Sequence, residues 1–372
     1  MFYKIFPIFM QKQFGLLILN TGTPDSHSTK DVSRFLYEFL TDPRIITLAS
    51  PWREIIVRCL IVPFRGYRSA RKYRAIWREE GSPLLVNAKA LAHSLEASLA
   101  IPAEVGMRYG NPSIRSGIKT LLDRGVNHIV ALPLFPHYAM SSYETAVECF
   151  KQNAKDLGVE CSVIPPYYNH PAYLSAMSDQ IHAHLPKDAH LLISYHGIPL
   201  AHVDMYRGIK EKDYEYQCKE QHRLLLEHTS LPASQVEVSF QSRLGHTRWL
   251  SPYTAERLKQ LPAEGIKKVA VICPSFVQDC LETLEEIEVE GRELFLNSGG
   301  EEFCFIPCLN RRTDYLHEII CPYITTHHEN RNTHLRRRLS GYQCNHKRSR
   351  AYSDTPLQYG GRRNPERLFG AS

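Results

Sequence analysis

Four short and continuous apolar runs constrain the fold of this chain more than any other feature. They are GLLILN at 15–20, HIVALPLFP at 128–136, HLLISYHG at 190–197 and KKVAVICPSF at 267–276. Each run has the length of a strand and lacks the polar–apolar alternation of a half-exposed strand, and several lead into helical patterns. Such strands are typical of parallel sheets that helices cover on both faces, so the chain is predicted to be an α/β protein.

Two of these runs stand in similar surroundings, RGVNHIVALPLF at 124–135 and EGIKKVAVICPSF at 264–276. Each is preceded and followed by a helical pattern, which indicates two related α/β domains, and 372 residues are enough for two. We place the first domain at 14–175 and the second at 176–324. Ligands bind at the carboxyl ends of strands in open α/β sheets, so a cleft between the domains is the expected site.

The basic character of the chain is concentrated in its last residues. The formal net charge is +6, but residues 325–372 hold ten Lys and Arg against three Asp and Glu, leaving 35 against 36 elsewhere. A solvated basic tail is therefore favoured over a nucleic-acid-binding arm, and no nucleic-acid partner is expected. Because 325–372 contains few apolar residues, we predict that it is disordered.

The remaining composition indicates a cytoplasmic protein. No run of about 20 apolar residues is present, so no membrane-spanning helix is expected. The opening MFYKIFPIFM has no small-residue cleavage site of a secretory signal, and it could either touch a membrane or pack on the protein. The ten cysteines include no C-x-x-C pair and suit a reducing compartment. We therefore expect a cytoplasmic location and leave peripheral membrane contact open.

His196 is the first candidate for chemistry. It ends the run at 190–197, directly before Gly197 and Pro199. A strand that breaks at Gly and Pro places its last side chains in a loop at the edge of the sheet. A neutral imidazole there can accept a proton or bind a metal. A structural histidine that bonds the turn is an equally good interpretation from position alone.

A row of carboxylates follows the run at 267–276. Glu282, Glu286 and Glu290 recur every four residues, so an α-helix would carry them on one face. Such a face can take up protons and bind a hard or borderline cation. Considered alone, however, the segment is better interpreted as a solvated acidic surface, which is common on helices.

Three further segments combine Arg with aromatic residues. They are RGYRSARKYRAIWREEGSPL at 65–84, GMRYGNPSI at 106–114 and QSRLGHTRWLSPYT at 241–254. We expect Arg108 to follow a short strand. Guanidinium groups bind carboxylates and rings stack on flat molecules, so these segments suit an aromatic ligand with carboxylates. For Arg68 and Arg71, an exposed helix surface is an equally good interpretation.

Taken together, these segments resemble the ferrochelatase family. The matching pieces, in the order of the family, are LLILNTGTPD, EFLTDPR, EEGSPL, GMRYGNPS, VALPLFPHY, SYHGIP, SFQSRLGHTRWLSPYT and SFVQDCLETLEEI, and they lie between Phe14 and Asn310. SYHGIP and DCLETLEEI are the most specific. The resemblance implies two Rossmann-like domains with a porphyrin in the cleft. It also implies a lyase of haem and porphyrin biosynthesis that inserts Fe²⁺ into protoporphyrin IX to form protohaem, with release of two protons.

The resemblance implies roles for individual residues as well. His196 and Glu282 would be the catalytic pair and the metal ligands. Glu286 and Glu290 would continue a proton path, often on a locally widened π-type helix. The porphyrin-binding residues implied by motif position are Thr21, Arg65, Tyr73, Ser82, Arg108 and Trp249.

Some positions depart from the family. Cys280 stands where some members carry a histidine, and the C-terminal region offers only Cys321 and the isolated Cys344. We therefore expect no iron–sulfur cluster and no permanently bound cofactor, with Fe²⁺ and protoporphyrin IX as substrates of a monomer. The alternatives are a chelatase for coproporphyrin or for cobalt, and a non-catalytic module that binds haem or metal.

Overall fold

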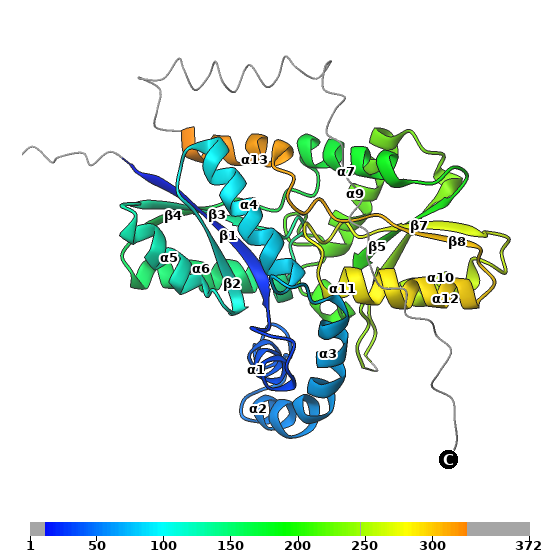
Figure 1. The fold of residues 1–372 in the computed structure, drawn as a ribbon, viewed down its shortest axis with the longest axis horizontal. Helices are drawn as coiled ribbons and strands as arrows, with labels where there is room; N and C mark the ends of the chain where they lie inside the picture. The colour runs from blue at the N-terminus through cyan, green and yellow to red at the C-terminus, as the bar shows by residue number, and fades with distance from the viewer. Residues whose placement is uncertain (1–11, 246, 326–372) are drawn as a thin grey trace, which may run out of the picture. The chain divides into compact units, whose positions relative to one another are not determined.

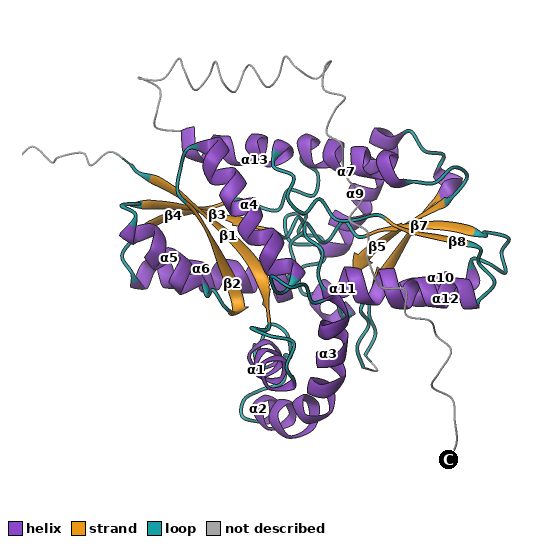
Figure 2. Cartoon of the chain, in the orientation of Figure 1, coloured by secondary structure: helices purple, strands orange, loops and turns teal. Residues whose placement is uncertain are grey.

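The computed structural model describes residues 12–245 and 247–325. Two four-stranded sheets form its centre, with the strand orders β2-β1-β3-β4 and β6-β5-β7-β8, and every pairing within them is parallel (Figures 1 and 2). The strands are β1 Phe14–Thr23, β2 Ala103–Gly110, β3 His128–Pro133, β4 Glu160–Val163, β5 His190–His196, β6 Val236–Gln241, β7 Lys268–Ile272 and β8 Glu302–Phe305. The predicted α/β class with two similar parallel sheets is confirmed.

Helices surround both sheets. The α-helices are α1 Thr29–Leu40, α2 Trp52–Ile56, α3 Val62–Ile76, α4 Pro83–Leu99, α5 Ile114–Asp123, α6 Thr145–Asp156, α7 Pro171–His184, α8 Leu200–Asp204, α9 Tyr214–Thr229, α10 Thr254–Gln260, α11 Leu281–Thr283, α12 Arg292–Asn297 and α13 Asp314–Thr325. The described chain also contains the π-helical segments η1 Val57–Ile61, η2 Met140–Glu144 and η4 Leu284–Gly291, and the 3₁₀ turn η3 Ala233–Gln235. No helix of the described residues is long and apolar enough to cross a membrane.

The four apolar runs are all strands, but two of them end earlier than the apolar sequence does. β3 ends at Pro133, and β7 ends at Ile272, two residues before Pro274. A proline has no N–H to donate to a neighbouring strand. Arg108 lies within β2 instead of after it. The first turn of α1 is capped by the Ser28 side chain, which accepts the Asp31 N–H.

Strand β1 shows why the apolar runs are continuous. Leu16 and Ile18 pack on one face of the first sheet, whereas Leu17 and Leu19 pack on the other, and all four are fully buried. Successive side chains of a strand point to opposite faces. Both faces are covered by helices, so neither set can be polar, and the same holds for β5 in the second sheet.

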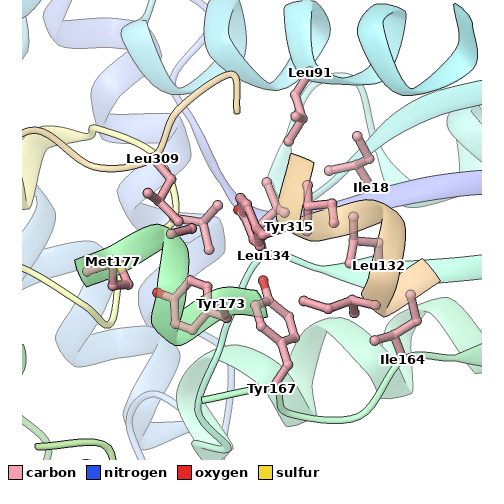
Figure 3. Close-up of a cluster of buried hydrophobic side chains, with 14 of the residues drawn as sticks. Ile18, Leu91, Leu132, Leu134, Ile164, Tyr167, Tyr173, Met177, Leu309 and Tyr315 are labelled. Atoms are coloured by element: carbon pink, nitrogen blue, oxygen red, sulfur yellow. The ribbon is translucent and has the colours of Figure 1, made fainter. Parts of the chain in front are cut away.

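The two halves share one apolar core. Buried side chains of the first half, such as Ile18 and Leu132, belong to the same cluster as Met177 and Leu309 (Figure 3). The last helix, α13, packs on α7 and also contacts β3 of the first sheet. The domain limits at 14–175 and 176–324 therefore stay a prediction. The tail predicted to be disordered lies outside the described residues from 326 onward, as does the N-terminal arm at 1–10.

Candidate active site

The backbone of His196 is held at the carboxyl ends of β5 and β7, where the strand order of the second sheet changes direction. Its N–H donates to Ser275 Oγ at 3.2 Å, and its carbonyl accepts from the Tyr214 hydroxyl at 2.7 Å. The imidazole meets the ring of Phe276 edge to face, with the centroids 5.8 Å apart. The side chain stays half-buried, so this histidine is positioned by its surroundings without being enclosed in the core.

The turn after His196 requires glycine. A Cβ at Gly197 would lie 2.6 Å from the Gln241 carbonyl oxygen, which accepts the Gly197 N–H at 2.9 Å. Gln241 ends β6, and its side-chain amide donates to the Glu282 carbonyl at 2.9 Å. Gln241 thus connects the turn that carries His196 to the first turn of α11, which carries Glu282.

The charge of Glu282 acts on His196. Burial lowers the pKa of His196 below its ordinary value, and the Glu282 carboxylate opposes that effect. The imidazole is therefore neutral at pH 7 and able to accept a proton. Glu282 also raises the pKa of Tyr73, a buried residue of α3, although burial is the larger cause there. The structure thus brings three residues predicted from the sequence together from the two halves.

Glu286 lies in the π-helical segment η4 and is held by a single serine. The backbone N–H and the hydroxyl of Ser242 each donate to its carboxylate at 2.6 Å. Burial raises the pKa of Glu286 to about 7, although the two Ser242 bonds lower it. Glu282 raises it further and Lys72 lowers it. This carboxyl group can therefore gain and lose a proton near neutral pH.

Glu290 is not arranged as an α-helix would place it. The Lys72 ammonium group, on α3, donates to Glu285 Oε2 at 2.8 Å and to Glu290 Oε1 at 2.7 Å. In the wider turns of η4, Glu290 and Glu285 therefore accept hydrogen bonds from the same lysine. Glu286 is bonded separately, to Ser242. The π-type helix implied by the family resemblance is present at 284–291.

Four of the predicted porphyrin contacts have distinct surroundings. Thr21 follows Asn20, whose side-chain amide donates across to Gln278 Oε1 of the second half at 3.2 Å. Arg65 is half-buried on α3, burial lowers its pKa, and no described residue forms an ion pair with it. The remaining two are the buried Ser82, which accepts from Thr23, and Trp249, whose ring packs near the turn at Gly197.

The guanidinium group of Arg108 forms an ion pair with a carboxylate of the first half. Its guanidinium group donates to Asp42 Oδ2 at 2.5 Å and to Thr145 Oγ1 at 2.9 Å. Asp42 is buried and also accepts from Tyr109 and Thr145, so these residues form one closed polar network. The structure therefore does not group Arg108 with His196 and Glu282.

Sequence reasoning missed several residues that shape the site. Gln241, Ser242 and Ser275 lie inside matched motifs at or shortly after the ends of β6 and β7, and Ser242 has a φ of 64° that non-glycine residues seldom adopt. Position after a strand could have identified these three. Tyr214 and Lys72 come from helices distant in sequence, and no local pattern distinguishes them from ordinary helix residues.

The site contains no larger cluster of metal-binding side chains among residues 12–245 and 247–325. No three His, Cys, Asp or Glu residues of this part of the chain are arranged to hold a metal ion. His196 lies at the carboxyl end of β5, and the charge of Glu282 acts on it.

The fold places this chain in the class of α/β proteins built on two parallel sheets flanked by helices. The structure resembles that of SirB from Bacillus subtilis, solved with Fe³⁺, with 14% identity, a TM-score of 0.50, and coverage of 85% of this chain and 96% of that one. At this identity the likeness establishes the shared fold.

Residues 13–325 match the ferrochelatase family. A ferrochelatase from Porphyromonas gingivalis is 44% identical over 323 residues, covering 81% of this chain and 93% of its own length. Ferrochelatase 1 of Shewanella oneidensis is 42% identical over 318 residues, covering 82% and 92%. The chain therefore belongs to the ferrochelatase family, whose members are metal-chelating lyases of haem biosynthesis with iron as a substrate, and the resemblance seen in the sequence is confirmed.

Proposed function

We propose that this chain inserts Fe²⁺ into protoporphyrin IX, with His196 and Glu282 as the catalytic pair. The observation that carries the proposal is a neutral imidazole at the tip of β5 on which the charge of Glu282 acts. Both residues stand in the motifs most specific to the family, SYHGIP and DCLETLEEI. The reaction consumes one ferrous ion and one free porphyrin, and it yields protohaem and two protons.

The chemistry requires a base. A free porphyrin carries two N–H protons at its centre, and the four nitrogens cannot all bind a metal until both protons leave. His196 accepts a proton because burial keeps the imidazole neutral. Glu282, whose charge favours the imidazolium form that results, receives the proton or assists delivery of the ferrous ion.

The protons then need a route to solvent. Glu286 is the next group of the proposed path, because a carboxyl group with a pKa of about 7 exchanges protons readily at neutral pH. Glu290 is partly exposed and bonded to Lys72, so it would deliver protons at the surface end.

Residues of the first half would hold the porphyrin. Arg65, without an ion-pair partner among the described residues, is suited to a propionate, and Tyr73 lies beside Glu282. Thr21, Ser82 and Trp249 complete the proposed set. Arg108 stays a predicted contact, and it would have to share its guanidinium group with Asp42.

Anaerobic insertion of Fe²⁺ into protoporphyrin IX by the purified full chain tests the proposal. Loss of porphyrin fluorescence with appearance of the protohaem spectrum, faster than without enzyme, is the expected result. A panel that adds coproporphyrin and Co²⁺ separates the alternative chelatases by their relative kcat/KM. Porphyrin or haem binding without turnover would instead indicate a binding module.

Metal choice gives a further expectation. Fe²⁺ lies low in the order of divalent-metal affinity, so nitrogen and carboxylate ligands cannot select it by affinity alone. Zn²⁺ and Co²⁺ should therefore also be inserted in vitro. Strict selectivity for iron in the same assay would contradict this expectation.

We also propose peripheral contact with an anionic membrane through α2, η1 and α3. This surface exposes the large apolar side chains of Trp52, Ile55, Leu60, Phe64 and Tyr67. Exposed arginines lie among them, at Arg58, Arg68 and Arg74. Apolar groups combined with positive charge favour a negatively charged lipid surface.

Vesicle sedimentation tests this contact. The chain should bind phosphatidylglycerol vesicles more than phosphatidylcholine vesicles, and Phe64→Glu should weaken binding. Equal sedimentation of the wild type and the variant would contradict the proposal. A cytoplasmic monomer without an iron–sulfur cluster remains part of the proposed function, and light scattering and the iron content of the purified protein would test the last two points.

A further inference from the structure

Lys72 bonds across the two halves of the molecule and takes up no proton in the proposed catalytic steps. It lies in the last turns of α3, and its ammonium group bonds Glu285 and Glu290 of η4. The Glu285 side chain is 10% exposed and that of Glu290 is 45% exposed, so the lysine joins a buried carboxylate to a surface one. A buried carboxylate needs such a partner, because leaving its charge unpaired is costly.

The spacing of the two carboxylates depends on the π-helical winding. In an α-helix, residues five apart point about 140° away from each other. One ammonium group would not reach both side chains readily in that arrangement. In a π-helix the hydrogen bond closes between residues i and i+5, so Glu285 and Glu290 stand one turn apart on the same side. The two hydrogen bonds that Lys72 donates, to Glu285 and to Glu290, therefore fit the π winding and not the α winding.

Helix α3 and segment η4, which Lys72 connects, both contain residues with proposed roles in the reaction. The charge of Glu282 acts on Tyr73, the neighbour of Lys72, and Arg65 lies seven residues earlier on α3. On the other side, Glu286 lies between Glu285 and Glu290 in the same widened segment. α3 and α11 lie side by side (Figure 1) and are in contact. A change in the winding of η4 would therefore rotate Glu286 away from Ser242.

We infer that Lys72 is a positioning residue that fixes η4 in its π winding and fastens it to α3. Its removal leaves Glu285 buried without a positive partner, so η4 relaxes toward a winding that brings Glu285 to solvent. Glu286 then loses its fixed orientation toward Ser242 and Glu282. The inference rests on the proposed function only for its effect on turnover, because the effect on η4 itself does not depend on activity.

The test compares Lys72→Met with Lys72→Arg and with Arg71→Met. Arg71 is the exposed neighbour on α3, so its variant removes the same charge without touching the bond. Lys72→Met should lower kcat for metal insertion about tenfold with less than about a threefold change in KM for porphyrin, because misplaced groups affect the chemical step. Lys72→Arg should restore most of the activity, and Arg71→Met should match the wild type.

Amide hydrogen exchange of 284–291 gives the readout that is independent of activity. Lys72→Met should exchange about tenfold faster there than the wild type, with little change in the strands. Equal exchange and equal kcat in Lys72→Met and Arg71→Met would overturn the inference. If Lys72→Met does not fold, Glu290→Gln removes the exposed partner and should give a smaller increase in exchange, and no increase would again overturn it. A wild type that inserts no metal would refute the proposed function, while the exchange measurements would still decide on Lys72.

Discussion

Two π-helical segments occupy corresponding places in the two halves of the molecule, but their carboxylates differ in state. η2 follows β3, the third strand of the first half, and η4 follows β7, the third strand of the second half. Each continues directly into an α-helix, α6 or α12. Glu144 of η2 and Glu286 of η4 are both partly buried, and burial acts on their pKa values in the same direction.

The difference lies in the donors. Burial would raise the pKa of Glu144, but the hydroxyls of Tyr138 and Tyr206 and the Arg44 guanidinium group outweigh it and lower that pKa. At Glu286 the two Ser242 bonds do not outweigh burial and the repulsion from Glu282. The same topology thus holds a carboxylate with a lowered pKa in one half and a carboxylate with a pKa of about 7 in the other. The hydrogen-bond donors around each carboxylate, which we call its donor supply, decide more than the fold does whether its pKa is lowered or raised.

The largest effect is expected from removing the base of the second half. His196→Ala should lower insertion at least about a thousandfold, because the pyrrole protons lose their acceptor. The circular dichroism spectrum and the unfolding temperature should stay close to those of the wild type, since the backbone bonds to Ser275 and Tyr214 do not involve the imidazole. Stopped-flow fluorescence of protoporphyrin measures the loss.

His93→Ala provides the matched control, because this histidine is exposed on α4. It should insert iron at the rate of the wild type. Turnover by His196→Ala near that rate would show that the second half does not supply the base.

A paired substitution tests the contrast between the halves directly. Glu282→Gln should lower kcat about a hundredfold, because the neutral amide can neither take up a proton nor favour the imidazolium form. Glu144→Gln should change kcat less than about twofold but lower the free energy of unfolding by about 1–3 kcal/mol, because its donors lose a charged acceptor. Steady-state insertion and urea unfolding of both variants give the comparison. Similar losses of kcat in the two variants would refute the division of roles.

The sequence predicted the parts of the molecule that depend on local patterns. Continuous apolar runs identified β1, β3, β5 and β7, because burial on both faces of a parallel sheet excludes alternation. His196 could be placed at a strand end because Gly197 and Pro199 follow it. Its role, however, required the family motifs, since an imidazole at a turn is equally compatible with a structural bond.

What the sequence could not predict depends on contacts between distant segments. The α-helical spacing of four did not predict the neighbour of Glu290. Because η4 is a π-helix, Glu290 and Glu285 bind the same lysine, Lys72. Arg108 has the type and motif position of a propionate ligand and stays a predicted contact, but its hydrogen bond to Asp42, 66 residues away, has no signal in the sequence. No period or spacing encodes which of two carboxylates a guanidinium group will meet.

The smallest expected effect concerns stability and tests the titration that distinguishes Glu286 from Glu144. The pKa of Glu286 is raised from 4.5 to about 7 by folding, so folding favours its protonated form. This contribution to stability is complete below pH 4.5 and is lost as the pH rises through 7. The Glu286→Gln variant has no carboxyl group to titrate at this position. The free energy of unfolding of the variant minus that of the wild type should therefore increase by about 2 kcal/mol between pH 5 and pH 8.

Urea unfolding of the wild type and the variant at a series of pH values measures this difference. Glu293→Gln, which removes an exposed carboxylate of α12, should show no such increase. For Glu144→Gln the sign is opposite, because the donors around Glu144 hold its pKa below the ordinary value and folding favours its charged form. The stability that Glu144 contributes is therefore present above its unfolded pKa and lost toward acid. Parallel pH profiles for Glu286→Gln and Glu144→Gln would contradict the claim that donor supply separates the two carboxylates.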